Sequence, residues 1–345
     1  MSSPYSALRR FYQSLAALTL ALLLTAAPAV GQLTEVMPET VGMSSDRLER
    51  LDSLILDYIE RDKIAGAVDL VLRNGRAAHF ESYGMMNREA GRKMPKDAIM
   101  RIASMSKAVT TIAVMILYEE GHFRLGDPVH EFLPEFEDPV VAVETDDEGD
   151  DSYETVPAER PITIHHLLTH TSGLTYGSGP AAPAYEEAGL SGWYLAGKDM
   201  TIGQVVEELA QLPLNAQPGE EWNYGYSTDV LGHLVEEVSG IPLDEFVDER
   251  IFTPLGMDDT HFFLPEEKAS RLAPVYGLTE EGTLEMTESR EETDYIHGPR
   301  TCFSGGGGLL STTEDYGRLL QMLLNGGVLD GHRILSPKTV DLMRS

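Results

Sequence analysis

Residues 101–110 read RIASMSKAVT, and within this stretch Ser104 stands three residues before Lys107. The chain has seven lysines, and only Lys107 has a serine at that spacing. Apolar residues recur at helical spacing from Ser104 to Glu120, and Gly121 follows, which predicts a helix. Positions i and i+3 share one helix face, so the amine comes within reach of the serine hydroxyl. A serine needs such a neighbour to become a nucleophile, so the pair is a candidate for catalysis.

The bare spacing of Ser104 and Lys107 also fits a structural interpretation, in which Ser104 caps the helix and Lys107 lies on the surface. A position at a helix start favours chemistry for a second reason, because the unpaired N–H groups there carry partial positive charge. Such groups can stabilise an oxyanion that develops during acyl transfer. The four residues from 104 to 107 leave both interpretations open.

Periodic apolar residues mark further helices, and turn residues mark a hairpin. Helices are expected over 46–62, 201–211, 228–239 and 312–325. Residues 65–72, the pair Asn74-Gly75 and the segment after it indicate two strands joined by a tight turn. Strand pairs that precede a mainly helical middle indicate an α/β or α+β fold class.

Four further segments follow in the chain: LLTHTSGL (167–174), PGEEWNYGYSTDVLG (218–232), PLGMDDTHF (254–262) and SGGGGLLSTTEDYGRLLQMLLNGG (304–327). Together with RIASMSKAVT they resemble the serine β-lactamase-like superfamily, which includes class C β-lactamases, penicillin-binding D-alanyl-D-alanine carboxypeptidases and β-lactamase-like esterases. The resemblance covers essentially residues 40–345. It implies a β-lactamase/transpeptidase-like antiparallel sheet flanked by helices, with an all-helical subdomain over roughly 122–240.

The resemblance also implies roles for three residues of this chain. Ser104 would be the acylated nucleophile, Lys107 would orient it, and Tyr224 would be the general base. An unperturbed tyrosine has a pKa of about 10, so Tyr224 needs a nearby cation, which Lys107 would supply. Such a reaction needs neither a metal nor an organic cofactor.

Three more residues would line the substrate site: Tyr226, Gly306 and Gly307. The alternative for Tyr226 is a packing residue whose hydroxyl is satisfied within the protein. Penicillin-recognising members carry Y-x-N, whose asparagine helps to hold the β-lactam amide, but this chain has Tyr224-Gly225-Tyr226. The departure favours esterase-like chemistry over a β-lactamase or a carboxypeptidase.

A second departure concerns the carboxyl end of the chain. The superfamily has a third box, K-T-G or H-x-G, on a strand after the glycine-rich run, and no such box follows residue 327. Lys338-Thr339-Val340 imitates K-T-G but lacks the glycine, which allows a close backbone approach. We therefore expect this chain to be C-terminally truncated, with sheet strands missing.

Three functions follow from these patterns. The first is a serine hydrolase that cleaves small esters by a two-step acyl transfer on Ser104. The second is a β-lactamase or D-alanyl-D-alanine carboxypeptidase that acts on penicillins or peptidoglycan. The third is an inert fragment or a binding module, because the third box is absent. The expected partners are small-molecule ester, β-lactam or peptidoglycan-type substrates, and the oligomeric state is left open.

The net charge limits which partners are expected, and the amino-terminal segment indicates the cellular compartment. The chain has 56 acidic and 26 basic residues and a formal net charge of -30, which makes nucleic acid a poor partner. Residues 1–31 combine two arginines, an apolar run and small residues, which is typical of a secretory signal. We therefore expect a periplasmic or secreted hydrolase domain over 32–345, without stable membrane insertion after signal cleavage. An uncleaved membrane anchor is the alternative.

Two segments could suggest a metal site. Residues 144–154 carry seven acidic residues and no basic one, but a calcium loop would need its closing glutamate at Thr155. A solvated surface loop explains the segment better. His165, His166 and His170 do not form an H-E-x-x-H pattern, so structural hydrogen bonding is the better interpretation. We expect no metal site, and the single cysteine cannot form an internal disulfide.

Overall fold

Residues 33–145 and 153–345 are described by a computed structural model. The predicted secretory signal over 1–31 and the middle of the acidic segment lie outside these described residues. The unit from Glu35 to Ser345 contains all the elements described below. No helix within the two described ranges combines the length and the apolar character needed to cross a membrane.

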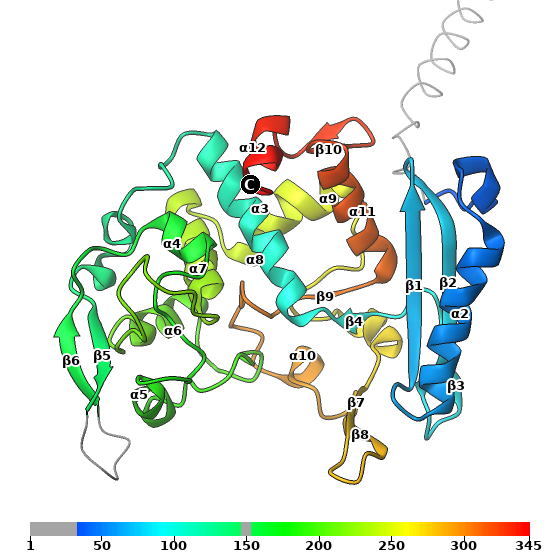
Figure 1. The fold of residues 1–345 in the computed structure, drawn as a ribbon, viewed down its shortest axis with the longest axis horizontal. Helices are drawn as coiled ribbons and strands as arrows, with labels where there is room; N and C mark the ends of the chain where they lie inside the picture. Colours follow the sequence, from blue (N-terminus) through cyan, green and yellow to red (C-terminus); the bar gives the residue numbers. More distant parts are fainter. Residues whose placement is uncertain (1–32, 146–152) are drawn as a thin grey trace, which may run out of the picture. The chain divides into compact units, whose positions relative to one another are not determined.

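A three-stranded antiparallel sheet follows the first long helix. Helix α2 (Ser45–Glu60) lies against β2, and the strand order is β1-β2-β3 (Figure 1). The strands span Gly66–Arg73 (β1), Arg76–Asn87 (β2) and Arg92–Lys93 (β3). Asn74 and Gly75 have φ angles of 54° and 71°, which the tight turn of a hairpin requires. The predicted helix and hairpin are confirmed.

Helix α3 (Ser106–Glu119) is buried along most of its length and packs against α7 (Ser227–Ser239). An apolar surface on nearly all sides is typical of a core helix. The α-helix begins at Ser106 and not at the predicted Ser104, because Ala103–Met105 forms a 3₁₀ turn, η2. The candidate nucleophile therefore lies in a tight turn that leads into the helix.

The remaining described elements connect these parts. The helices are α4 (Ile164–Leu168), α5 (Ala182–Glu187), α6 (Ile202–Leu209), α8 (Leu243–Val247), α9 (Thr253–Leu255), α10 (Asp294–His297), α11 (Thr313–Leu324) and α12 (Pro337–Leu342). Shorter 3₁₀ or π turns are η1 (Pro38–Val41), η3 (Val129–Glu131), η4 (Pro134–Phe136), η5 (Asp248–Phe252) and η6 (Glu266–Arg271). The short strands are β4 (Met100–Arg101), β7 (Val275–Leu278), β8 (Leu284–Glu288), β9 (Leu310–Ser311), β10 (Val328–Leu329) and β11 (His332–Arg333). Helices α6, α7 and α11 confirm three of the predicted helices.

The expected all-helical subdomain over roughly 122–240 requires a correction. Strands β5 (Val140–Glu144) and β6 (Tyr153–Pro157) form an antiparallel hairpin within it (Figure 1). The first strand is rich in valine, a β-branched residue that favours extended backbone. Leu214 adds main-chain hydrogen bonds to this strand. The acidic segment 144–154 therefore joins two strands, and its middle residues lie outside the described part of the chain.

The segment Lys338-Thr339-Val340 lies in α12, where the Ser336 side chain accepts a hydrogen bond from the Thr339 N–H. A helical position differs from the strand on which a K-T-G box is expected. The helix-like character expected for this segment is therefore confirmed. The expected absence of C-terminal strands stays a prediction.

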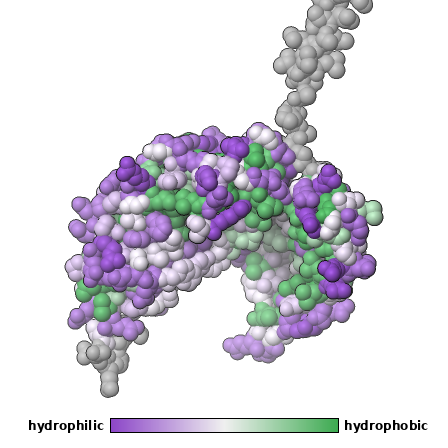
Figure 2. Space-filling model, turned by 45° about the horizontal axis from the view of Figure 1, so that its top comes forward, coloured by the Kyte–Doolittle hydropathy of each residue, from purple (hydrophilic) through white to green (hydrophobic). Residues whose placement is uncertain are grey.

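A cavity of about 510 Å³ lies between β1 and α11. Its lining is mainly apolar and includes Val68, Leu70 and Leu72 of β1 together with Leu320 and Leu324 of α11. Figure 2 shows apolar residues gathered where the surface is hollowed. Leu320 and Leu324 are 51% and 65% exposed, so the face of α11 toward β1 is partly open to solvent.

Candidate active site

Ser104 lies in the turn that joins β4 to α3. Strand β4 pairs with β9, and this pairing fixes the chain just before the turn. Ala103 has a φ of 44°, a left-handed conformation that costs a residue with a Cβ atom roughly 1–2 kcal/mol. Strained backbone persists only where the surrounding structure enforces it, and it clusters at active sites. The side chain of Ser104 is exposed, so its hydroxyl is open to a substrate.

Lys107 stands one turn after Ser104, as their spacing predicts. Its Nζ atom donates to the Gly306 carbonyl oxygen at 2.7 Å, to the Tyr176 hydroxyl oxygen at 3.1 Å and to Ser104 Oγ at 3.4 Å. Within the described part of the chain, these hydrogen-bond partners are hydroxyls and a carbonyl and include no carboxylate. The ammonium therefore acts on the serine hydroxyl without a carboxylate in direct contact with it.

Tyr224 comes from the loop before α7 and faces the lysine through its ring. The Lys107 Nζ atom lies 4.6 Å from the ring centroid, a distance typical of a cation–π contact. The ring also contacts the rings of His170 and Tyr176, with centroids 5.0 and 5.8 Å away. Tyr224 is 38% exposed, which leaves part of its side chain open to solvent. The structure thus brings Ser104, Lys107 and Tyr224 together, while the role of each stays a prediction.

Tyr176 belongs to the same cluster, although the sequence motifs do not single it out. Burial, and after it the charge of Asp229, raise the pKa of the Tyr176 hydroxyl well above its ordinary value. The residue is therefore a neutral hydroxyl near pH 7, which can bind Lys107 but is a poor general base. The sequence feature that could have pointed to Tyr176 is its position two residues after the LLTHTSGL segment, which ends at Leu174.

The glycine run 305–308 forms the floor beneath the lysine. A Cβ atom on Gly306 would lie 2.3 Å from Asp229 Oδ2, and one on Gly307 would lie 2.9 Å from Cε3 of Trp193. Side chains are therefore excluded by close contacts, and only glycine allows this approach. Gly306 contributes its carbonyl group to the site, where that group binds Lys107. Contacts of Gly306 or Gly307 with a substrate stay predictions.

Tyr226 is 1% exposed and lies behind Tyr176. Its hydroxyl donates to the carbonyl oxygens of Leu190 at 2.9 Å and Gly192 at 2.6 Å. The Tyr226 and Tyr176 ring centroids are 4.7 Å apart. Both the ring and the hydroxyl are thus used within the protein. The structure favours the packing role of Tyr226 over the predicted substrate contact, and Tyr226 supports Tyr176 from behind.

His170 supports the loop that carries Tyr224. Its carbonyl oxygen accepts a hydrogen bond from the Asn223 N–H at 2.7 Å. Burial lowers the pKa of His170 to about 4, and the charge of Lys107 adds to this effect. The ring is therefore neutral near pH 7 and adds no second cation beside the lysine. Across the described ranges, no three histidine, cysteine, aspartate or glutamate side chains are arranged to hold a metal ion.

A cavity of about 410 Å³ lies beside the turn that carries Ser104. Ala103 and Trp193 contribute to its wall. The rest of the wall includes the methionines Met85, Met86, Met94 and Met100 and the basic residues Lys63 and Arg101. Methionine side chains are flexible and polarizable, so they adapt to apolar groups of irregular shape. The cavity therefore offers an apolar part of a substrate a place next to the nucleophile turn.

Comparisons with known proteins identify the family of this chain and several of its relatives. The family model described as Beta-lactamase matches residues 51–345. Esterase EstB of Burkholderia gladioli is 33% identical over 294 residues, which cover 79% of this chain and 69% of that protein. Protein Rv1367c of Mycobacterium tuberculosis is 38% identical over 294 residues, 84% of this chain and 70% of that protein. The solved structure of EstCE1, a hydrolase with promiscuous acyltransferase activity, has a TM-score of 0.70 at 30% identity and covers 86% of this chain and 76% of its own.

Proposed function

The chain belongs to the Beta-lactamase family and is a serine hydrolase, and we propose that it hydrolyses small carboxylic esters through an acyl-enzyme on Ser104. One observation carries this proposal: the Lys107 ammonium is fixed by the Gly306 carbonyl and lies 3.4 Å from Ser104 Oγ. A cation in that position favours the ionised form of a nearby oxygen. The arrangement is therefore suited to activating a serine.

The proposed reaction has two steps. In the first, Ser104 Oγ attacks the ester carbonyl carbon while its proton passes to the Tyr224 oxygen, which the charge of Lys107 keeps available as a base. The bond from the carbonyl carbon to the alcohol oxygen breaks, and the alcohol leaves with that proton. In the second, water attacks the acyl-enzyme and gives a proton to Tyr224. The carboxylic acid then leaves, and Ser104 regains its proton.

An ester is favoured over a β-lactam by the residue two positions after Tyr224. Penicillin-recognising relatives hold the amide there with an asparagine, whereas this chain has Tyr226. Tyr226 is buried, and its hydroxyl already donates to main-chain carbonyls. It therefore offers no amide contact of that kind, and an ester needs none.

The surroundings of Ser104 favour an apolar and uncharged substrate. The methionine-lined cavity next to Ala103 suits an apolar group. The formal net charge of -30 repels anionic substrates at low ionic strength. Short-chain neutral esters therefore suit both the apolar cavity and the negative net charge of the chain.

The proposal is tested by p-nitrophenyl butyrate hydrolysis in wild type and Ser104→Ala. We expect kcat/KM to fall at least about 10³-fold, because the nucleophile is removed. Ser53→Ala is the matched control, because Ser53 is an exposed helical serine whose hydroxyl donates only to the Glu49 carbonyl. This control should keep wild-type kcat/KM.

Equal rates in wild type and Ser104→Ala would contradict the proposal. A chromogenic cephalosporin and a labelled penicillin are measured in parallel. Cephalosporin hydrolysis without ester hydrolysis would instead support the β-lactamase alternative. Absence of turnover with every substrate, together with no labelling by penicillin, would support an inert fragment or a binding module.

We also propose that the chain is exported, on the basis of the signal-like pattern in residues 1–31. Expression of the full chain in a bacterium, followed by fractionation and N-terminal sequencing, tests this proposal. We expect a mature form that begins near residue 32 outside the cytoplasm. A full-length chain retained in the cytoplasm would contradict it.

A further inference from the structure

We infer that Asp229 is a positioning residue for Lys107. Its buried carboxylate holds Gly306 in the orientation that binds the Lys107 ammonium, and it supplies a countercharge for that ammonium. The inference rests on the proposed function, because it concerns the lysine that is proposed to activate Ser104. It adds a residue from α7 to a site whose nucleophile and lysine come from α3 and the turn before it.

The geometry connects the carboxylate to the lysine through one residue. Asp229 is 1% exposed and lies in the first turn of α7. Its Oδ1 atom accepts hydrogen bonds from the Ser304 hydroxyl at 2.6 Å and from the Gly306 N–H at 3.0 Å. The carbonyl oxygen of the same Gly306 accepts from Lys107 Nζ at 2.7 Å. Gly306 is therefore fixed through its N–H by the Asp229 carboxylate and through its carbonyl by the Lys107 ammonium.

The packing around Gly306 allows little other arrangement. A Cβ atom at this position would lie 2.3 Å from Asp229 Oδ2 and 2.9 Å from the Tyr176 hydroxyl. Ser304, which is 2% exposed, also accepts the Gly307 N–H through its Oγ atom at 3.2 Å. The carboxylate thus fixes the main-chain N–H groups of two successive residues, Gly306 directly and Gly307 through Ser304. A change at Asp229 is expected to reach the lysine through this backbone.

The charges support the same assignment. Burial raises the pKa of the Asp229 carboxyl, while the hydrogen bonds from Ser304 and Gly306 and the charge of Lys107 oppose that rise. A buried carboxylate is costly without such compensation. By the same interaction, the carboxylate attracts the Lys107 ammonium and helps to hold it in place.

Other titratable groups face the two charges. They are Tyr176, Tyr226 and Cys302 around Asp229, and Tyr176, Tyr224 and His170 around Lys107. Burial raises the pKa of the two buried tyrosines and of the thiol and lowers that of the histidine, so these four groups are neutral near pH 7. Among these groups, the Asp229 carboxylate is therefore the countercharge for the lysine.

The test begins with Asp229→Asn. The amide oxygen can still accept the two hydrogen bonds, so the substitution removes mainly the charge. We expect kcat for p-nitrophenyl butyrate to fall about 10- to 100-fold, with KM changed less than about threefold. We also expect the alkaline limb of the kcat profile to move to lower pH by about one unit, because Lys107 loses its countercharge.

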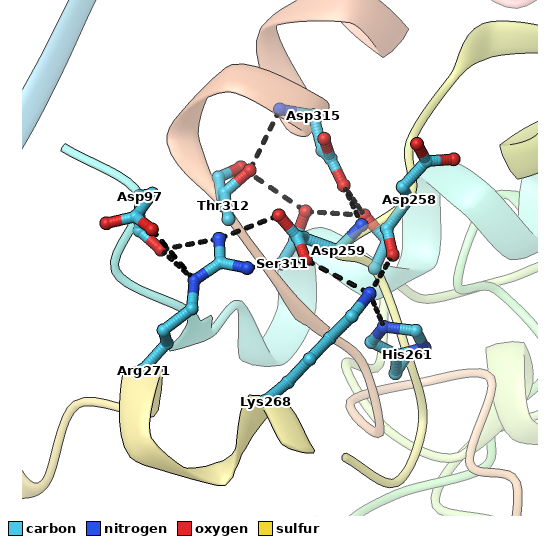
Figure 3. A network of polar contacts seen from close by, with 10 residues as sticks. Asp97, Asp258, Asp259, His261, Lys268, Arg271, Ser311, Thr312 and Asp315 are labelled. Atoms are coloured by element: carbon cyan, nitrogen blue, oxygen red, sulfur yellow. Dashed lines mark hydrogen bonds and ion pairs between the residues drawn. The ribbon is translucent and has the colours of Figure 1, made fainter. Parts of the chain in front are cut away.

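Asp315→Asn is the matched control. Asp315 is also a buried aspartate, and its Oδ2 atom accepts from the Thr260 hydroxyl at 2.9 Å and the Asp259 N–H at 2.8 Å. It belongs to the polar network of Figure 3 and does not contact Lys107. We expect this variant to change Tm while kcat and its pH profile stay at wild-type values. A loss that came only from a weakened fold would appear in both variants.

Ser304→Ala keeps the inference falsifiable if Asp229→Asn does not fold. It removes the hydroxyl that stabilises the Asp229 carboxylate. The carboxyl group stays in place, but it loses one hydrogen bond that favours its ionised form. We expect the same changes in kcat and pH profile as for Asp229→Asn, but smaller. A normal kcat profile in Ser304→Ala, or a raised KM with normal kcat in either variant, would overturn the positioning role.

A readout that does not depend on turnover separates this inference from the proposed function. With [¹³Cε]lysine, the seven lysines of the chain give seven signals to follow by NMR, and Lys107→Arg assigns one of them. We expect the chemical shift of the Lys107 signal to change in Asp229→Asn and to stay at its wild-type value in Asp315→Asn, whether or not an ester is hydrolysed. An unchanged Lys107 signal in Asp229→Asn would overturn the inference even where Ser104-dependent ester hydrolysis is established. A changed signal without ester hydrolysis would leave the inference standing and contradict the proposed function.

Discussion

Two lysines of this protein lie in opposite kinds of surroundings. Lys268 of η6 belongs to the polar network of Figure 3, where its Nζ atom lies 3.1 Å from Asp259 Oδ1 and 3.1 Å from His261 Nε2. Arg271 binds the same Asp259 at 2.7 Å. Lys107 instead contacts hydroxyls, a carbonyl group and the faces of tyrosine rings.

The two lysines use their charges differently: Lys268 holds segments of the fold together, and Lys107 acts on Ser104. In the network, each cation meets a carboxylate, and together they tie η6 to the start of α11 and to the segment before β4. At the site, the Asp229 carboxylate that compensates Lys107 is separated from it by Gly306. The ammonium therefore keeps a donor for Ser104. Paired charges fix a segment, and a cation paired at a distance can act on a reacting group.

The largest expected effect comes from removing each lysine. Lys107→Ala should lower kcat/KM for p-nitrophenyl butyrate at least about 10³-fold, because Ser104 and Tyr224 lose their cation. Lys268→Ala should leave kcat near wild type and reduce the free energy of unfolding by about 1–2 kcal/mol, because Asp259 loses one of its two cations and His261 Nε2 loses its contact with Lys268.

Steady-state kinetics and urea unfolding on both variants measure this double difference. The comparison fails if Lys268→Ala loses activity as strongly as Lys107→Ala. It also fails if Lys107→Ala is active.

A smaller effect is expected from adding one methyl group to the glycine floor. Gly306→Ala places a Cβ atom 2.3 Å from Asp229 Oδ2, so the carboxylate or the main chain must move. We expect kcat to fall about 10- to 100-fold, because the carbonyl that holds Lys107 moves with it. Gly126→Ala is the control, because its Cβ atom would meet nothing within 4 Å and its φ is not positive. Equal kinetics in both variants would show that the position of the floor is unimportant.

The sequence predicted the parts of the site that depend on local spacing. Ser104 and Lys107 are one helical turn apart, so their proximity follows from the chain itself. Tyr224 was found because its segment resembles a family motif. The β1–β2 hairpin was found because Asn74-Gly75 has a strong turn preference.

The parts that depend on tertiary packing were not predicted. Tyr176 reaches Lys107 across 69 positions of sequence, and no local period records that approach. Asp229 acts through Gly306, 77 positions away, so its residue type alone does not reveal it. The β5–β6 hairpin was missed because the acidic segment between the two strands was interpreted as a loop of a helical region. For Tyr176 and Asp229, the decisive partner is distant in the chain.

The smallest expected effect is a difference in the pH dependence of stability. Burial, and after it the charge of Lys268, lower the pKa of His261 to about 4. The unfolded chain, with a histidine pKa of about 6.5, therefore binds a proton between pH 6.5 and 4 that the folded chain does not, and stability falls as pH falls. His261→Asn should make this loss of stability shallower. Burial raises the pKa of Asp315 to about 6, which acts in the opposite direction over nearly the same range and is common to both proteins.

Urea unfolding of wild type and His261→Asn at pH 4.5 to 7 measures the two slopes. A steeper loss of stability in His261→Asn would contradict the assignment. An unchanged slope would show that the lysine network does not hold His261 neutral.

The central claim is that Lys107 makes Ser104 the nucleophile of this chain. The most direct test is mass spectrometry of the folded protein after reaction with a fluorophosphonate. Trypsin cleaves after Arg101 and Lys107, so the peptide 102–107 contains both Ser104 and the buried Ser106. We expect the adduct on Ser104 in wild type, none on Ser106, and labelling at least about 100-fold slower in Lys107→Ala. An adduct on another residue, or equal labelling rates in the two proteins, would contradict the claim.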